Sequence, residues 1–343
     1  MYKKIIYESI KIKDNKTIKD AMTILNSNDQ RFLLVIDSKG KLLGTITDGD
    51  IRRAILKGIL IDKSVIFCMN KKPVTSKGYA KNYDSLFEKM PSIIKFLPIV
   101  DNSKKIKAVL LEDTKKIERT ALIMAGGFGK RLGKITKNTP KPLLKIKANP
   151  ILEIILQKLE AASYKKIYIS THYLHDRIEK FIKKRKSKVD INIIYESKPM
   201  GTAGSIFQLK NKDFKNLTVL NGDIISDINL DALNQFHLEK KYDLTLTVAC
   251  YNHTIPFGVV EFDKNFKFKS LSEKPSKKYF ILSGIYCLSK RVCDLTLKNY
   301  LDMPDLINQS KKLGYKIGVF PIYEYWNDIG TFKALTTEKS RKK

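Results

Sequence analysis

A short apolar strand that runs directly into a glycine-rich turn constrains the fold of this chain more than any other feature. Residues 121–131 read Ala-Leu-Ile-Met-Ala-Gly-Gly-Phe-Gly-Lys-Arg. Glycines adopt backbone angles closed to other residues, and they let backbone N–H groups approach phosphate oxygens closely. Arg131 adds a planar fork of donors for the same oxygens. The segment therefore predicts a strand that ends in a polyphosphate-binding turn.

Two better-known glycine motifs do not fit this turn. A dinucleotide-binding fingerprint needs a third glycine where Leu132 stands, and a P-loop needs Gly-Lys-Ser/Thr, which does not occur in the chain. A glycine turn between a strand and a helix also occurs without any ligand. A nearby segment, Pro140-Lys141-Pro142, favours function, because two prolines hold its lysine in an extended conformation poorly suited to a helix. A lysine fixed so close to a phosphate-binding turn indicates a catalytic role.

The two segments together resemble the signature of the sugar-1-phosphate nucleotidyltransferases, Gly-Gly-x-Gly-[Thr/Lys]-Arg-Leu followed by Pro-Lys-Pro-Leu. The resemblance runs from residue 120 to the end of the chain, and further motifs occur in the family's order. They are Gly201-Thr202-Ala203-Gly204, Asn221-Gly222-Asp223, Phe257-Gly258-Val259-Val260, Glu273-Lys274-Pro275, Ser283-Gly284-Ile285-Tyr286 and Trp326-Asn327-Asp328-Ile329-Gly330-Thr331. A series of short motifs in order is far more specific than any single one.

The resemblance implies a reaction in which a sugar-1-phosphate attacks the α-phosphorus of a nucleoside triphosphate and pyrophosphate leaves. It implies that Asp223 and Asp328 hold a Mg²⁺ ion, since hard oxygen ligands suit that ion. Arg131 and Lys141 would be the catalytic cations, acting on the pyrophosphate and on the α-phosphate region. The positions implied for the nucleotide are Ala125, Gly126, Gly127, Gly129, Lys130, Arg131, Gly201 and Thr202, and those for the sugar phosphate are Gly258, Glu273, Lys274 and Gly284.

Several of these residues also have ordinary structural interpretations. A Gly-Asp pair such as the one ending at Asp223 is commonly a turn. Glu273 and Lys274 could form an exposed ion pair of little energetic weight. Trp326, the one tryptophan in the chain, suits a core or a domain interface as well as a ligand contact.

The chain after a short linker at 115–120 alternates predicted strands and helices. Strands are expected at 121–125, 166–170, 191–195 and 217–221, and a helix at 151–162. This order predicts a Rossmann-like α/β domain over 120–343, a mostly parallel sheet with helices on both faces. Ligands bind at the carboxyl ends of such strands, so we expect the glycine turn and Asp223 on one edge of the sheet.

The first 115 residues contain an internal repeat with an offset of 64 residues, in which Phe32 to Leu42 recurs as Phe96 to Ile106. Each copy predicts two strands around a polar turn, and the first adds helices near 17–27 and 49–58. The first copy resembles a CBS domain, and the pair, 1–58 and a degenerate 59–115, resembles a tandem CBS (Bateman) α/β module.

The CBS resemblance implies one regulatory site for an adenine nucleotide, at Thr47 and Asp50. The second copy carries Ala108, Leu111 and Thr114 where the first has Gly44, Thr47 and Asp50, so two sites are not expected. The alternative interpretation is that the two CBS copies serve only in packing or dimerisation and bind no nucleotide. Paired CBS modules often associate, and we expect a homo-oligomer, at least a dimer.

Composition places limits on these interpretations. The chain has 343 residues, 43% of them hydrophobic, which suffices for two domains with cores. It has no apolar run of membrane-spanning length and no signal peptide at its start, so we expect a soluble cytoplasmic protein without a membrane partner. Cys68, Cys250, Cys287 and Cys293 show no metal-ligand spacing and are interpreted as reduced core thiols. His172 and His175 lack a convincing third metal ligand.

The net charge of +30 raises the hypothesis of a nucleic-acid partner. The charge is carried mostly by scattered lysines, and runs such as Lys183-Lys184-Arg185-Lys186 suit a solvated helix end. Arginine clusters and interleaved aromatic residues are lacking, so no nucleic-acid partner is expected.

The choice of nucleotide and of sugar phosphate rests on resemblance alone. The CBS pair combined with Met-Ala-Gly-Gly-Phe-Gly-Lys-Arg resembles the guanylyltransferases that make GDP-sugars for bacterial nonulosonic acids, with glucosamine-1-phosphate as the acceptor in the legionaminic acid route. GTP with glucosamine-1-phosphate is the resulting expectation. Mannose-1-phosphate or a heptose phosphate remains the alternative acceptor, and uracil, thymine or cytosine the alternative base. A nucleotide sensor with an inactive transferase half is a further hypothesis.

Overall fold

The structure is a computed structural model that describes residues 2–28, 30–80, 83–90, 95–112 and 118–341. These form two compact units, one of Met1–Arg119 with Asn229–Asp243 and one of Thr120–Ile228 with Leu244–Lys343. Thr114 and the predicted boundary at residue 115 lie outside the described residues. Across the described ranges, no helix combines the length and the apolar character needed to cross a membrane.

Within the described residues, the first unit contains two small sheets, one built on each copy of the repeat, but β1 from the predicted first copy (1–58) pairs with β7 in the sheet of the second copy. One has the order β2-β3-β4 and the other β1-β7-β6-β5. Phe32 and Phe96, equivalent in the repeat, stack with ring centroids 3.6 Å apart. The strands are β1 (Tyr2–Ile5), β2 (Lys11–Lys13), β3 (Phe32–Ile36), β4 (Leu42–Thr47), β5 (Ser76–Lys77), β6 (Phe96–Val100) and β7 (Ile106–Glu112), and the helices are α1 (Ile18–Ser27), α2 (Asp48–Leu56), α3 (Asp84–Glu88) and α6 (Leu230–Glu239).

The second unit is built on a seven-stranded sheet with the order β12-β11-β8-β13-β18-β15-β19. The pairs β11–β12, β8–β13 and β15–β19 are parallel. β18 runs antiparallel to both of its neighbours, β13 and β15. The strands are β8 (Arg119–Met124), β11 (Tyr164–Thr171), β12 (Asp190–Tyr195), β13 (Asn216–Asn221), β15 (Leu244–Thr254), β18 (Ser276–Ser289) and β19 (Ile317–Ile322). The predicted α/β class is confirmed, with one antiparallel strand inside the sheet that the sequence did not predict.

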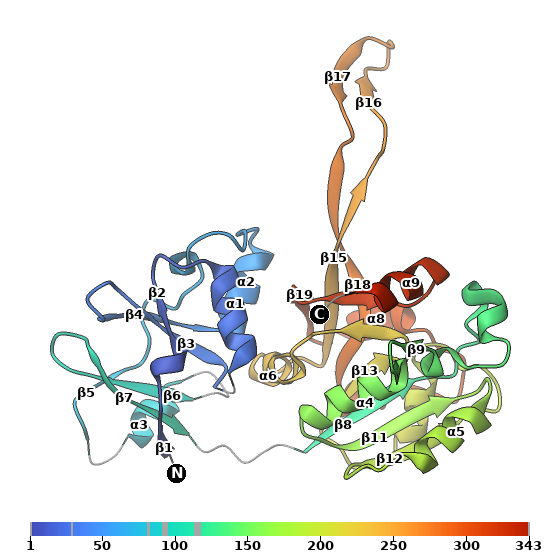
Figure 1. Cartoon of the computed structure of the whole chain (residues 1–343), viewed down its shortest axis with the longest axis horizontal. Helices are drawn as coiled ribbons and strands as arrows, with labels where there is room; N and C mark the ends of the chain where they lie inside the picture. Colours follow the sequence, from blue (N-terminus) through green and yellow to red (C-terminus); the bar gives the residue numbers. More distant parts are fainter. Residues whose placement is uncertain (1, 29, 81–82, 91–94, 113–117, 342–343) are drawn as a thin grey trace. The chain divides into compact units, whose positions relative to one another are not determined.

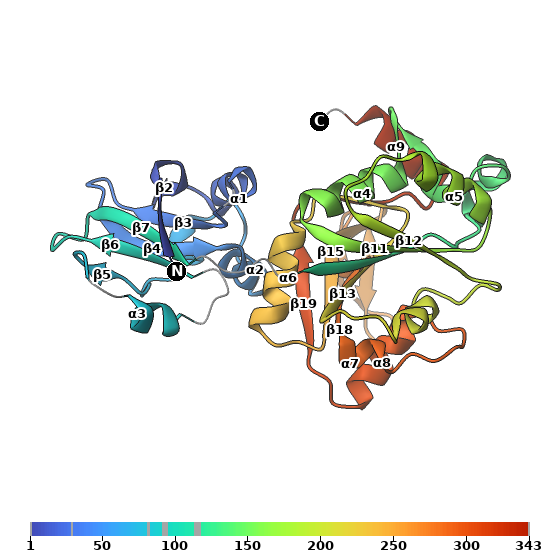
Figure 2. The ribbon, with the colours of Figure 1, turned by 90° about the horizontal axis from the view of Figure 1, so that it is seen from below.

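Helices lie on both faces of this sheet. Figure 2 shows α4 and α5 on one side and α7 and α8 on the other. α4 buries Ile151, Ile155 and Leu159, whose spacing keeps them on one face of the helix. The helices are α4 (Ile151–Ala161), α5 (His175–Lys184), α7 (Lys290–Cys293), α8 (Met303–Lys312) and α9 (Phe332–Ser340).

Two strands of the sheet continue far beyond it. β15 and β18 stay paired from Val248 opposite Leu282 to Thr254 opposite Ser276. They lead into a second hairpin, β16 (Val259–Phe262) with β17 (Phe268–Ser272), and the whole ribbon projects from the sheet, as Figure 1 shows. We call residues 251–279 the ribbon. Cys250, expected in the core, is exposed at its base, whereas the other three cysteines are buried.

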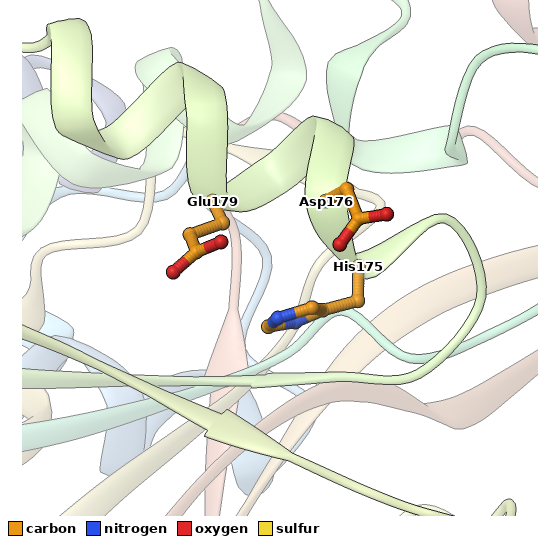
Figure 3. Close-up of side chains that lie close together, drawn as sticks. All are labelled: His175, Asp176 and Glu179. Atoms are coloured by element: carbon orange, nitrogen blue, oxygen red, sulfur yellow. The ribbon is translucent and has the colours of Figure 1, made fainter.

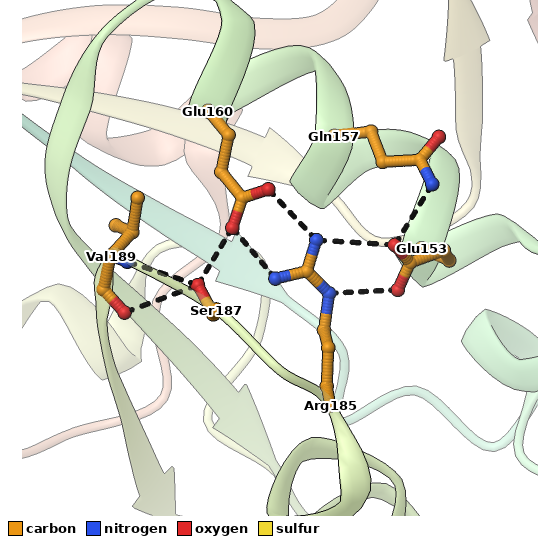
Figure 4. A network of polar contacts seen from close by, with 6 residues as sticks. All are labelled: Glu153, Gln157, Glu160, Arg185, Ser187 and Val189. Atoms are coloured by element: carbon orange, nitrogen blue, oxygen red, sulfur yellow. Dashed lines mark hydrogen bonds and ion pairs between the residues drawn. The ribbon is translucent and has the colours of Figure 1, made fainter.

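The prediction that residues 183–186 form a solvated helix end is wrong for one residue. Arg185 directly follows α5, and only 9% of its side chain is exposed. Its guanidinium donates to Glu153 Oε2 at 2.8 Å and to Glu160 Oε1 at 2.6 Å, and both glutamates lie on α4 (Figure 4). The hydrogen bond from Arg185 lowers the pKa of Glu160. The arginine therefore joins two helices instead of facing water, because α4 presents a matching pair of carboxylates.

Candidate active site

The glycine turn follows β8 directly. Ala125 is buried, and its N–H donates to the carbonyl of Ser170 at 2.8 Å. Gly129 has a φ of +63°, and a Cβ at this position would lie 2.8 Å from the Thr136 side chain. The turn then enters a 3-10 helix, η3 (Lys130–Thr136). The left-handed backbone and the close approach together explain the glycine at 129.

Two strands bring Asp223 and Asp328 together. β14 (Ile224–Ser226) pairs antiparallel with β20 (Trp326–Asp328), and Ile224 stands opposite Asp328. The Ile329 N–H donates to the Asp223 carbonyl at 3.0 Å. A Cβ at Gly222 would lie 2.8 Å from the Met124 carbonyl, so this glycine lets the end of β13 approach the end of β8. The aspartates that the sequence predicted as a pair thus lie at the same edge of the sheet as the glycine turn.

Lys141 lies between these carboxylates. The predicted extended segment is only partly confirmed: Pro140 is extended, but Lys141–Leu143 form one 3-10 turn, η4. Proline is compatible with such a turn because the first residues of a helix need no N–H donor. The Lys141 side chain is 9% exposed, forms an ion pair with Asp223, and places its Nζ 3.7 Å from Asp328 Oδ1.

The environment of Asp328 suits a divalent cation. Burial, followed by the nearby charge of Asp223, raises the pKa of the Asp328 carboxyl. Its Oδ1 is buried and has no hydrogen-bond partner among the residues that the structure describes. Arg131 lies close by, with guanidinium atoms 3.0–3.2 Å from the position that a Cβ on Gly330 would take. Two converging carboxylates, one with an unsatisfied oxygen, are a donor set that fits Mg²⁺.

A cavity of about 280 Å³ lies beside the aspartate pair. Predicted residues that line it are Gly126, Gly127, Gly201, Thr202 and Asp223. The loop at 201 is tightly fixed, since a Cβ on Gly201 would lie 2.5 Å from the Leu301 carbonyl. The Thr202 hydroxyl accepts from the Met303 N–H at 2.8 Å, which anchors the loop to α8. The cavity thus joins the glycine turn to the loop at Gly201 and Thr202, both of which the resemblance implied for the nucleotide.

Residues outside the predicted list of ligand-binding positions also line this cavity: Met124, Phe128, Glu196, Pro199, Met200, Asn221, Tyr300 and Asp302. Glu196 is the most informative of them. It is 4% exposed, its Oε1 is bonded to the Ser170 hydroxyl, and its Oε2 accepts from the Met200 N–H at 3.1 Å. Glu196 directly follows β12, so the rule that identified Asp223 after β13 would also have found it.

The predicted sugar-phosphate residues do not lie together. Gly284 has a φ of +77° and packs against Asn221, where a Cβ would lie 2.7 Å from the side-chain nitrogen. Gly258, Glu273 and Lys274 instead lie on the ribbon and are exposed. Glu273 Oε2 lies 3.1 Å from the position of a Cβ on Gly258. Only Gly284 of this set is therefore adjacent to the aspartate site.

The two histidines do not form a metal pair. His172 donates from Nδ1 to the Glu196 carbonyl at 2.7 Å, and His175 Nδ1 bonds the Thr171 hydroxyl at 2.8 Å. His175 instead clusters with Asp176 and Glu179 on the same helix (Figure 3). Exposed groups of this kind are common without an ion, and we assign no metal to them.

In the first unit, Thr47 and Asp50 lie at a strand-to-helix junction, as the repeat predicted. Asp50 Oδ2 accepts from the Thr47 N–H at 2.8 Å and from its hydroxyl at 2.7 Å, which closes a capping box on α2. Both residues line a cavity of about 250 Å³, together with Thr45, Asn70, Met90 and Phe96.

Sequence comparisons identify the class of this protein. The profile of the family "Nucleotidyl transferase" matches residues 120–342, which is well over half of the chain, and the chain belongs to this family. The profile "CBS domain" matches residues 4–57. The predicted fold class is thereby confirmed for the nucleotidyltransferase domain and for one N-terminal CBS domain, whereas the second CBS copy stays a prediction.

Three relatives and one solved structure illustrate the similarity. The chain is 30% identical over 224 residues to mannose-1-phosphate guanylyltransferase catalytic subunit beta of Drosophila melanogaster, covering 63% of this chain and 61% of that protein. It is 33% identical over 221 residues to the bifunctional protein GlmU of Methanococcus maripaludis, covering 61% and 51%. It is 30% identical over 217 residues to D-glycero-alpha-D-manno-heptose 1-phosphate guanylyltransferase of Campylobacter jejuni, covering 61% and 94%. The crystal structure of HddC from Yersinia pseudotuberculosis shares the fold, with a TM-score of 0.51, 24% identity, and coverage of 64% and 98%.

Proposed function

We propose that this protein is a sugar-1-phosphate guanylyltransferase, which transfers the GMP moiety of GTP to a sugar-1-phosphate and releases pyrophosphate. The observation that carries the choice of guanine is Glu196 in the cavity beside the aspartate pair. An ionised carboxylate only accepts hydrogen bonds. Guanine presents two adjacent donors, N1–H and the N2 amino group, whereas uracil and thymine present one N–H between two carbonyls. A carboxylate therefore attracts the edge of guanine and repels the carbonyls of the pyrimidines.

Each charged residue near the aspartates has a role in this proposal. Asp223 and Asp328 would hold Mg²⁺, which supplies positive charge to the phosphates when bound. Lys141, now paired with Asp223, is within reach of a phosphate that enters beside it, and it would stabilise the charge that develops at the α-phosphate. Arg131, packed on Gly330, would hold the leaving pyrophosphate. The glycine turn adds backbone N–H donors.

For the acceptor we propose glucosamine-1-phosphate. The support is the resemblance of this domain combination and glycine turn to the guanylyltransferases of the legionaminic acid route. The names of the Drosophila and Campylobacter relatives make mannose-1-phosphate and heptose-1-phosphate the alternatives. These substrates are intracellular metabolites, and we propose that the reaction takes place in the cytoplasm.

Pyrophosphate release by the full chain with Mg²⁺ tests this proposal. GTP, UTP, dTTP, CTP and ATP are each offered with glucosamine-1-phosphate, mannose-1-phosphate, a heptose-1-phosphate and N-acetylglucosamine-1-phosphate. We expect turnover with GTP and glucosamine-1-phosphate above all other pairs. A different productive base would contradict the role of Glu196, and turnover with GTP and another sugar would correct the acceptor alone.

The variant Glu196→Gln tests the base contact through the ratio of GTP to UTP turnover, because a change in its contacts with Ser170 and Met200 would affect both nucleotides. An amide oxygen still accepts from one donor of guanine, but the amide nitrogen faces the other donor. We expect the kcat/KM for GTP to fall about 10- to 100-fold, equivalent to one or two charge-assisted hydrogen bonds. Thr202→Ser, at the rim of the same cavity, keeps its hydroxyl and serves as the control. An unchanged ratio of GTP to UTP turnover in Glu196→Gln would count against a base-reading carboxylate.

A regulatory adenine nucleotide is a second proposal, favoured by the cavity that contains Thr47 and Asp50. Carboxylate and hydroxyl groups at a strand-to-helix junction suit the hydroxyls of a ribose. Calorimetry with AMP and ATP is expected to show binding that Asp50→Asn weakens. Asp20→Asn in the capping box of α1 is the matched control, because it removes the same kind of cap away from the cavity. Equal binding by both variants would contradict the proposal.

A further inference from the structure

The hairpin at the tip of the ribbon has one apolar face. Val260 stands opposite Leu271, and Phe262 opposite Phe268. Cross-strand partners point to the same side of a ribbon, and Val260 and Phe262, two apart along β16, share that side. The register shifts between Glu261 and Phe262, so Phe268 stands opposite Phe262 although it lies three residues from Leu271. These four residues therefore form one surface, which we call the tip face. The opposite side carries Glu261 and Ser270, whose side chains are hydrogen-bonded at 3.1 Å.

The tip face is open to solvent. The exposed fractions are 52% for Val260, 57% for Phe262, 62% for Phe268 and 61% for Leu271. Phe266, in the turn, is 84% exposed and stacks on Phe262 with ring centroids 5.8 Å apart. A two-stranded hairpin is marginally stable in water unless it has a partner surface. An apolar side with a polar reverse is the pattern of a half-buried sheet, so the tip face indicates a surface that is covered in solution.

The hydrogen bonding of the ribbon disfavours a conformation in which the tip face folds back onto the sheet of the same chain. The stem pairs continuously from Val248 opposite Leu282 to Thr254 opposite Ser276, and the Ile255 N–H donates to the Pro275 carbonyl at 3.1 Å. This ladder holds the tip at the end of a projecting stem (Figure 1). Folding the tip face onto the sheet would require several of these hydrogen bonds to break. A second copy of the chain reaches the tip without that cost.

The tip face is also complementary to itself. An apolar face of four side chains on a two-stranded ribbon packs well against an identical face across a two-fold axis, as isologous interfaces do. Each phenylalanine buries roughly 150–250 Å² when fully covered, so three of them with Val260 and Leu271 offer an area on the order of several hundred Å². That is most of the roughly 800 Å² per partner found in standard specific interfaces. The polar sides of both ribbons would remain in water.

We propose that the tip face is a dimerisation surface, through which two copies of this chain associate ribbon to ribbon by Val260, Phe262, Phe268 and Leu271, with Phe266 of the adjoining turn at its edge. The contact is independent of any association between the N-terminal units and of the proposed reaction. It places the exposed Gly258, Glu273 and Lys274 next to an interface between copies.

Sedimentation equilibrium of the full chain tests the proposal. Phe262→Ser with Phe268→Ser is compared with Glu261→Gln and Ser270→Thr, a pair at the same level of the ribbon on its polar side. We expect the apparent mass to fall about twofold in the phenylalanine variant and to stay at the wild-type value in the control, because an isologous contact joins two copies. The N-terminal units are the same in all three proteins, so a difference in apparent mass between the variants reports on the tip face alone. Equal masses for all three proteins would overturn the proposal.

A second measurement leaves the tip face intact. Ser270→Cys in a Cys250→Ser background carries a spin label on the polar side, and pulsed electron resonance measures distances between labels. We expect one short intermolecular distance that disappears when labelled chains are diluted with excess unlabelled chains. Because each chain carries one label, every distance is intermolecular, and the absence of a short distance would overturn the proposal.

Discussion

Two charged clusters in the transferase unit are built in opposite ways. Around Arg185, one guanidinium meets two carboxylates, and it donates to Glu153 at 2.8 and 3.1 Å and to Glu160 at 2.6 and 2.9 Å (Figure 4). Around Lys141, one ammonium lies near two aspartates, and within the described part of the chain Asp328 Oδ1 has no hydrogen-bond partner. A network in which every charged group has its hydrogen-bond partners, such as that of Arg185, stabilises the structure. Two carboxylates that the fold holds close together with too little positive charge between them indicate instead a ligand-binding site.

The largest expected effect comes from the unsatisfied cluster. Asp223→Asn removes one of the two proposed metal carboxylates and the partner of Lys141. We expect turnover to fall by about 10³-fold or more, because charge neutralisation at the phosphates is the main source of catalysis in such a reaction. Pyrophosphate release measures the loss. Thermal unfolding is expected to show that the variant remains folded, and a turnover within a few fold of the wild type would remove Asp223 from the site.

The next effect comes from the satisfied cluster. Arg185→Met leaves two partly buried glutamates without their cation, and we expect the free energy of unfolding to drop by about 2–3 kcal/mol. Denaturant unfolding measures this drop. Turnover of the folded fraction is expected to stay near the wild-type value. The triple variant Arg185→Met, Glu153→Gln, Glu160→Gln is the control, since it also removes the orphaned charges and should recover part of the loss. Equal stability of wild type and Arg185→Met would refute the structural role.

A smaller effect of the opposite sign is expected at Asp328. Asp328→Asn relieves the repulsion with Asp223 and removes a partly desolvated charge, so the metal-free protein should gain up to about 1 kcal/mol in stability. In the wild type, Mg²⁺ should raise the Tm, and in the variant this rise should be lost or much reduced. Calorimetric scans with EDTA and with Mg²⁺ measure both quantities. A metal-free variant that is less stable than the wild type would contradict the interpretation of Asp328 as a strained carboxylate.

The smallest effect is a difference in pH dependence between the clusters. Folding raises the pKa of Asp328, so its ionised form costs stability above that pKa, and metal-free stability should increase as the pH falls towards 3.8. Folding lowers the pKa of Glu160, so its contribution is present above 4.5 and is lost as the pH falls below it. Subtracting the stability profile of Asp328→Asn, or of Glu160→Gln, from that of the wild type isolates each contribution. If both contributions changed with pH in the same direction, the predicted difference between the two clusters would be wrong.

Local sequence predicted the pieces of the candidate site. The glycine turn, the end of the strand before Asp223 and the helix from Ile151 to Ala161 follow from backbone freedom and from the spacing of apolar residues. The same reasoning would have reached Glu196 after β12 had it been applied to every strand of the sheet. It missed Arg185, because a run of four basic residues gives no sign of which one meets two carboxylates on another helix.

The sequence by itself determined the strand, the glycine turn and the proline-flanked lysine, since these depend on conformations that neighbouring residues allow or forbid. Only the tertiary structure decided that β18 runs antiparallel inside the sheet, that β14 and β20 bring Asp223 to Asp328, and that Gly258 and Lys274 stand on a projecting ribbon. Pairing between strands far apart in the chain depends on how all elements share one core. Which strands pair therefore depends on the whole fold and cannot be predicted from a local sequence pattern.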